Sequence, residues 1–314
     1  MTAPRPDQAT RPRRRVQPAR TPRSARPPRV PRPPRPAPQG LGAVVGTAST
    51  MVTLVAVWAL LQLLVLGGVA HDREQTLLYR DFRVQLAETT APLGPTVPVG
   101  DPVAIMTIPA IGLDEVVVEG TASGDLLAGP GHQRGTPLPG QRGFSVVMCR
   151  AATYGAPCAH LGDLRPGDDV DVLTSQGRKT LNVLGVRREG DPVPAFTDPA
   201  AAVVTLISAE GQGRLSALTP DTTVYVDAVS SEAFPTPAGY GGVAPKAEQA
   251  MQRDTSALPL LALWLALLVG LSTAVVLARQ RWSASLVWVV AGPVALSLAW
   301  LSTDTAMRLL PNLL

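Results

Sequence analysis

Cysteine and histidine are scarce in this chain, which limits the chemistry that the sequence can carry. Among 314 residues there are two cysteines, Cys149 and Cys158, and three histidines. The two cysteines do not have the spacing of a zinc site, so we expect no metal and no cofactor. A set of aspartates lacks the alternating spacing of a calcium loop, and we interpret its members as solvated turn residues: Asp168, Asp169, Asp171 and Asp191.

Acidic residues are nearly absent from the first 40 positions, which hold 11 arginines and 12 prolines against one acid, Asp7. This tail carries +10, and because the formal charge of the whole chain is +4, the remainder carries −6. The basic pI therefore describes the tail, which argues against a nucleic-acid-binding fold. Residues 1–40 show no apolar periodicity and predict a disordered cytoplasmic tail that binds lipid headgroups or docks a cytoplasmic partner.

Charge is absent from three apolar stretches, at 41–70, 255–278 and 282–303. Each is long enough for a helix that crosses a bilayer, which takes about 20 residues. We predict three transmembrane helices, the first a signal anchor because its uncharged stretch is about twice the usual length of a cleaved signal peptide's apolar region. Basic flanks stay in the cytoplasm, so the N-terminus and the loop at 279–281 are predicted inside and residues 71–254 outside.

Between the first two predicted spans the pattern changes from helical to β. Residues 71–102 predict a short helix over 73–89 and a linker. Residues 230–254 are rich in proline, glycine and alanine and predict a flexible tether. Residues 103–229 contain seven β-branched runs separated by turn residues, which predict an all-β domain with a small closed barrel: 104–108, 115–119, 144–149, 170–174, 180–187, 203–208 and 223–229.

A series of short motifs in this β region resembles one family. IPAIGL at 108–113, VVEGT at 117–121, GPGH at 129–132 and GTPLPG at 135–140 follow one another in order. With TYGAP at 153–157, LRPGD at 164–168 and VTLIS at 204–208, they resemble the sortases, especially those of actinobacteria, over about 103–229. The resemblance implies the eight-stranded sortase barrel and a membrane-bound protein of the bacterial cell envelope.

The resemblance also implies a transpeptidase, which cuts a sorting signal on a secreted protein and joins it to an amine. Sortases use a cysteine thiolate as nucleophile, a histidine as acid and an arginine for the oxyanion. Aligned on the family motifs, Arg150 occupies the histidine position, Ala209 the cysteine position, and Thr222 or Thr223 the arginine position. A methyl group cannot attack, and a guanidinium does not exchange protons as imidazole does.

Nearby residues offer weak substitutes for the missing groups. Ser208 precedes Ala209, so on a strand its hydroxyl is expected on the opposite face. Arg214 lies well upstream of the arginine position. Cys149 is a weak alternative nucleophile, since no histidine is near it in sequence. In an oxidising compartment Cys149 and Cys158 form either a disulfide or two partly buried thiols.

The remaining motif residues are interpreted as structural, with His132 stabilising a turn: Gly129, Pro130, Gly131, His132 and Tyr154. The leading hypothesis is a non-catalytic sortase-like protein that acts in binding or assembly. Its predicted partners are the bilayer, a surface protein or sorting-signal peptide, and a catalytically intact sortase. One alternative is a transpeptidase with a rebuilt site, and another is a scaffold that acts through the tail.

Overall fold

The computed structural model describes residues 41–196, 198–211, 222–279 and 281–314. The predicted disorder of residues 1–40 and the position of Arg214 lie outside the described residues. The long helices are α1 (Leu41–Leu61), α2 (Gly67–Ala87), α3 (Leu258–Ala278) and α4 (Ala284–Met307), and a π-helical turn, Gln62–Leu66, joins the first two. The strands are β1 (Pro102–Ile108), β2 (Leu113–Glu119), β3 (Gly131–His132), β4 (Gly143–Met148), β5 (Asp169–Thr174), β6 (Gly177–Arg188), β7 (Ala202–Glu210) and β8 (Thr222–Ser230).

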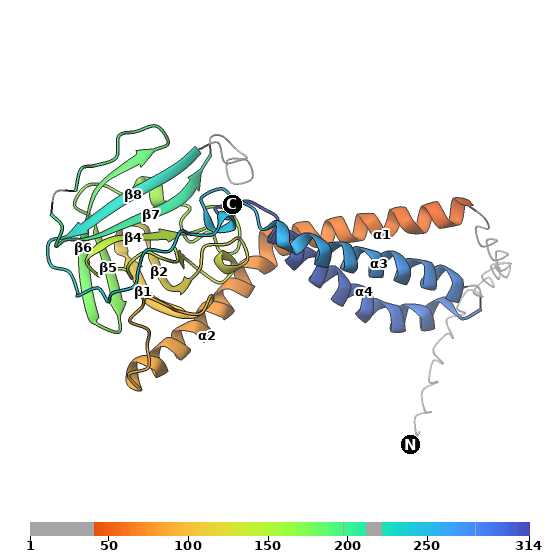
Figure 1. Ribbon diagram of the computed structural model, residues 1–314. Coiled ribbons are helices and arrows are strands. Elements are labelled where there is room, and N and C mark those ends of the chain that lie inside the picture. The colour runs from red at the N-terminus through yellow and green to blue at the C-terminus, as the bar shows by residue number, and fades with distance from the viewer. Residues whose placement is uncertain (1–40, 197, 212–221, 280) are drawn as a thin grey trace, which may run out of the picture. The chain divides into compact units, whose positions relative to one another are not determined.

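The eight strands found in the described residues close into a barrel in the order β1-β2-β3-β4-β7-β8-β6-β5 (Figure 1). Strands β4 and β7 run parallel, as do β2 and β3, and the β1–β5 pair closes the ring. All seven predicted strands are present, and the predicted barrel is confirmed. The eighth strand, β3, was not predicted because two residues are too short to show an alternating pattern.

Strand β7 is buried on both faces, and this feature positions the candidate site. Val204 and Leu206 point into the main core, whereas Ile207 and Ala209 belong to a separate apolar cluster. Successive side chains on a strand point to opposite faces. The second face of β7 is therefore covered by other parts of the chain.

Helix α2 packs against the outside of the barrel. Its Phe82 is fully buried with Ile105 of β1 and Val116 of β2. The Gln75 side chain accepts from the Val116 N–H at 2.7 Å and donates to the Ala128 carbonyl at 2.8 Å. The helix begins at Gly67, earlier than predicted, because α1 continues into it through the π-helical turn.

Among the described residues, two helices are long and apolar enough to cross a membrane, at Thr255–Ala278 and Ser285–Met307. They pack against each other through Val275, Val287 and Ala291. The first predicted span, the signal anchor at 41–70, is wrong by this measure, because the apolar helix found there is limited to Val52–Leu61. The π-helical turn interrupts this apolar stretch, and the chain becomes polar from His71 onward.

Residues 230–254 do not form the free tether that their composition predicts. The Phe234 N–H donates to the Gly140 carbonyl at 2.9 Å, and the Thr121 hydroxyl donates to the Glu248 carbonyl at 2.7 Å. Glu248 is buried and paired with Arg134. Proline and glycine leave few apolar contacts, but main-chain hydrogen bonds hold this segment against the barrel.

Candidate functional site

Arg150 lies just past the end of β4, after Cys149, and is fully buried. Its Nη2 donates to the main-chain oxygen and the hydroxyl of Ser123, both at 2.8 Å. Its Nη1 donates to the Thr153 hydroxyl at 2.9 Å and to the Leu314 main-chain oxygen at 3.4 Å. Burial lowers the pKa of Arg150 to about 10, partly opposed by Tyr154. The side chain is therefore still a cation at neutral pH and acts only as a donor.

Ala209 lies near the end of β7, on the face opposite the main core. It packs in a cluster, here called the Ala209 cluster, with Ile207 of the same strand and with residues from three other segments: Leu126, Met148 and Leu313. The neighbouring Ser208 is turned to the other face, and its hydroxyl donates to the Cys149 carbonyl at 3.0 Å. No nucleophilic side chain replaces Ala209 among the described members of this cluster.

Thr222 and Thr223 start β8, where Thr223 is paired with Ala209 and Thr222 with Glu210. Two arginines on the neighbouring strand β6 were not considered in the sequence analysis. Arg187 Nε donates to Asp227 at 2.7 Å, and Arg188 Nε donates to Glu210 at 2.5 Å. The β6–β8 pairing that places them near β8 leaves no local signal in the sequence, and both arginines are already engaged by carboxylates.

A disulfide joins Cys149 and Cys158, whose Cα atoms are 5.8 Å apart. The loop that it closes has positive φ angles at Tyr154, Gly155 and Ala156. Such angles are costly for residues with a Cβ, so the loop needs support from its surroundings. With both sulfurs bonded and buried in the main core, Cys149 offers no thiolate.

The loop is also pressed against the first helices. A Cβ built on Gly155 would lie 2.8 Å from Cδ2 of His71, and one built on Gly67 would touch the Tyr154 ring at 3.5 Å. Glycine at these positions allows the helix and the loop to approach closely. The N-terminal part of α2 therefore packs directly against the Tyr154 loop.

His71, which looks incidental in the sequence, is buried at this junction. Its Nε2 lies 3.0 Å from Oε1 of Glu115 on β2, and its Nδ1 lies 3.4 Å from the Leu127 carbonyl. Burial alone would lower the pKa of His71, but the hydrogen bond and charge of Glu115 outweigh it, and the pKa is raised above 6.5. The ion pair thus joins α2 to the barrel when His71 is protonated.

We predict that His71→Gln removes about 2 kcal/mol of stability at pH 6 and much less above the raised pKa. A raised pKa in the folded state stabilises the protein below the unfolded pKa, and this contribution is lost as pH rises through the folded value. Thermal unfolding of the full chain in detergent at pH 6 and pH 9 measures it. His160→Gln, at an exposed histidine paired with Asp163, is the control and should leave the pH dependence unchanged. An unchanged pH dependence in His71→Gln would contradict the prediction.

The other motif residues occupy a buried turn. His132 Nδ1 lies 2.7 Å from Oε2 of Glu119, and its Nε2 lies 2.9 Å from the Pro137 carbonyl. Gly131 and His132 form β3 and link β2 to β4. Within the part of the chain that the structure describes, no three histidine, cysteine or acidic side chains are grouped to hold a metal ion.

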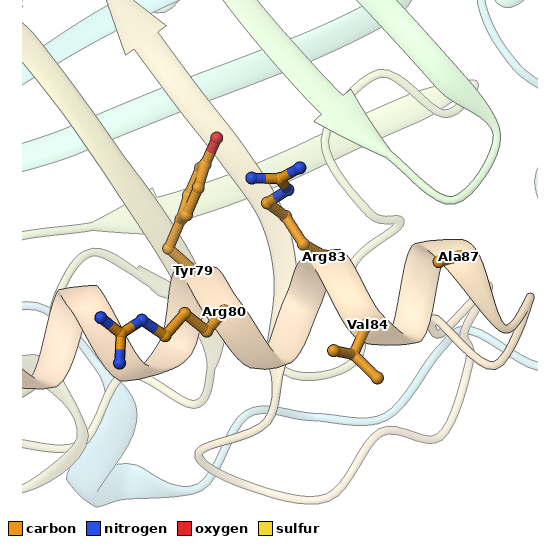
Figure 2. A pocket seen from close by; sticks show the side chains of 5 residues that line it. All are labelled: Tyr79, Arg80, Arg83, Val84 and Ala87. Atoms are coloured by element: carbon orange, nitrogen blue, oxygen red, sulfur yellow. The ribbon is translucent and has the colours of Figure 1, made fainter.

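A shallow hollow lies along α2 and is lined by Tyr79, Arg80, Arg83, Val84 and Ala87. Figure 2 shows Tyr79 and Arg83 on one side of the helix and Arg80 and Val84 on the other. The Arg83 guanidinium lies 5.8 Å from the centre of the Tyr79 ring. The hollow has no cysteine, serine, histidine or carboxylate in its lining, so it does not extend the candidate site.

The closed barrel of eight strands in the described residues is like that of the sortases. Residues 106–216 match the family model described as Sortase domain. The match covers less than half of the chain and supports the sortase resemblance for the barrel domain. No curated protein matches it.

Several solved structures are similar to the chain. A Sortase D5 transpeptidase from Clostridium perfringens is 17% identical, with 50% of this chain and 96% of that chain covered and a TM-score of 0.38. The SrtF sortase from Corynebacterium diphtheriae is 24% identical over 51% of this chain and all of its own, with a TM-score of 0.37. A mutant of sortase E from Streptomyces avermitilis is 26% identical over 49% and 100%, with a TM-score of 0.36.

Proposed function

We propose that this chain is a membrane-attached sortase-family protein that does not catalyse transpeptidation and acts in binding or assembly at the bacterial cell envelope. The observation that carries the proposal is Ala209, at the family's nucleophile position and buried in the Ala209 cluster. A methyl side chain has no lone pair with which to attack a peptide carbonyl.

The groups around Ala209 also lack the means to replace a sortase site. Arg150, at the family's histidine position, keeps its proton at neutral pH, and three of its four donated hydrogen bonds go to Ser123 and Thr153. Ser208 points away from the Ala209 cluster, and Cys149 is bonded to Cys158. Groups of a catalytic site act as a unit, so several simultaneous losses reduce rates by orders of magnitude.

Membrane attachment is proposed through α3 and α4, which together would form a helical hairpin. The basic loop at 279–281 between them favours the cytoplasmic face. A hairpin returns the chain to the side on which it entered, so the barrel and residues 309–314 would both lie outside. Proposed partners on that side are a sorting-signal peptide of a surface protein and a catalytically intact sortase.

The test is a transpeptidation assay of the full chain in detergent. Sorting-signal peptides are mixed with a glycine oligopeptide as the amine, and products are measured by mass spectrometry beside an active sortase. The expected rate is at least about a thousandfold below that of the active enzyme. Cys149→Ala should leave this residual rate unchanged. Product that forms with the intact chain and disappears in Cys149→Ala would support the rebuilt transpeptidase instead.

A further inference from the structure

The residues that follow α4 enter the candidate site. Helix α4 ends at Met307, and Asn312, Leu313 and Leu314 are all buried against the barrel. Figure 1 shows this end of the chain beside the barrel strands. The segment at 309–314, here called the terminal segment, contributes Leu313 to the cluster that covers Ala209.

Side chains and main chain both fix the terminal segment. The Asn312 Nδ2 donates to the carbonyls of Thr121 and Gln249, each at 2.9 Å, and its main-chain N–H donates to the Gln252 carbonyl at 2.9 Å. Leu313 is fully buried in the Ala209 cluster. An amide with two donors and an aliphatic side chain in an apolar pocket are the features by which a groove recognises a peptide.

The loop closed by the disulfide donates hydrogen bonds to the main chain of the same segment. The Ala151 N–H donates to the Leu313 carbonyl at 3.0 Å. The Leu314 main-chain oxygen accepts from the Thr153 hydroxyl at 2.6 Å and from Arg150 at 3.4 Å. Hydrogen bonds from a buried cation are stronger than those between neutral groups. The guanidinium at the histidine position thus serves to hold a peptide oxygen.

Some buried polar atoms of this site have no hydrogen-bond partner. They include Arg150 Nε and Asn312 Oδ1. A segment that leaves buried groups unpaired is held less tightly than its contact list suggests, because each unpaired group costs free energy. The unpaired Asn312 Oδ1 therefore lowers the free energy that the terminal segment gains by packing against the barrel.

We propose that the terminal segment is a ligand in cis for a peptide-binding groove formed by Arg150, Thr153 and the Ala209 cluster, and that a peptide from outside binds only when this segment is released. The peptide class is an asparagine followed by an aliphatic residue, with a main-chain or carboxylate oxygen for Arg150. The inference deepens the proposed binding function and rests on it for the role of the groove. According to this inference, the segment that follows α4 controls whether a peptide can enter the groove.

The test compares the intact chain, Leu313→Asp and Leu310→Asp, all as full chains in detergent. Leu313→Asp places a charge in the apolar cluster and should release the segment. Leu310→Asp makes the same change at a partly exposed neighbour and is the control. The probe is a fluorescein-labelled peptide with the sequence of residues 309–314, as the free acid and as the amide, followed by anisotropy.

Both peptides should bind Leu313→Asp at least tenfold more tightly than the intact chain or Leu310→Asp, the free acid the more tightly because Arg150 is a cation. A peptide with alanine in place of asparagine should lose most of the binding. Exchange of the Ala151 amide hydrogen should be slow in the intact chain and fast in Leu313→Asp. Equal binding to the intact chain and to a folded Leu313→Asp, or no binding to either, would overturn the inference.

Asn312→Ala keeps the leucines and provides a second variant in case Leu313→Asp does not fold. It should show faster exchange at Ala151 and a smaller gain in peptide binding, and no change in either would also overturn the inference. If no peptide binds, the proposal that the protein is non-catalytic is not contradicted. Turnover in the transpeptidation assay would contradict the non-catalytic proposal but not the inference that the terminal segment occupies the groove. The failure of one claim can therefore be told from the failure of the other.

Discussion

A chain that carries Ala209→Cys together with Arg150→His is expected to form a trace of thioester with a sorting-signal peptide and to remain at least about a thousandfold slower than an active sortase. The two changes restore a thiol and an imidazole at the family positions. The arginine position still holds Thr222 or Thr223, and the loss of an oxyanion-stabilising group alone costs about 10²–10³ in rate. Leu313 also packs where the substrate would approach residue 209.

Release of the terminal segment should raise the activity of this double variant. With Leu313→Asp added, the thioester and product should both increase, and intact-mass measurement of the protein detects the thioester directly. The matched control is Ser208→Cys with Arg150→His, which places the same thiol one residue earlier on the opposite face of β7. It should give no thioester, and equal yields from the two positions would contradict the placement of Ala209 at the site.

The barrel could be predicted from the sequence because its signals are local. Alternating β-branched runs bounded by glycine, proline and aspartate mark each long strand, and Gly112, with φ of 69°, lies in the turn between β1 and β2. The seven runs predicted a closed barrel, and the resemblance then added the expected number of eight strands. Strand β3 was not predicted because it is two residues long. The parallel β4–β7 pairing was not predicted because it joins segments about 60 positions apart.

The candidate site could be predicted only in part. Arg150 and Ala209 were predicted from the family motifs, but Ser123 and the terminal segment contact Arg150 from distant positions that share no motif with it. The hydrogen bond from Thr153 to Leu314 crosses 161 positions. Composition misled at 230–254, where main-chain hydrogen bonds hold the segment against the barrel. It also misled at 41–70, where a π-helical turn that composition does not reveal interrupts the apolar helix.

Loss of the disulfide should cost the protein about 3 kcal/mol of stability, as expected for a short closed loop. Cys149 and Cys158 are nine positions apart, and the loop between them holds Arg150, Thr153 and Tyr154. The closed loop limits the unfolded chain and also supports the positive φ angles at 154–156. The midpoint temperature of thermal unfolding of the full chain should therefore fall by roughly 6–12 °C in Cys149→Ala.

A double-variant comparison separates the disulfide from two packed thiols. If the sulfurs are bonded, Cys149→Ala, Cys158→Ala and the double variant should all lose about the same stability, because the first change already breaks the bond. If both are free thiols, the two losses should be small and should add. The intact chain should also resist alkylation until a reductant is present. Because the loop carries the donors that hold the terminal segment, all three variants should exchange the Ala151 amide hydrogen faster, whereas a control change at the exposed Phe144 of β4 should not.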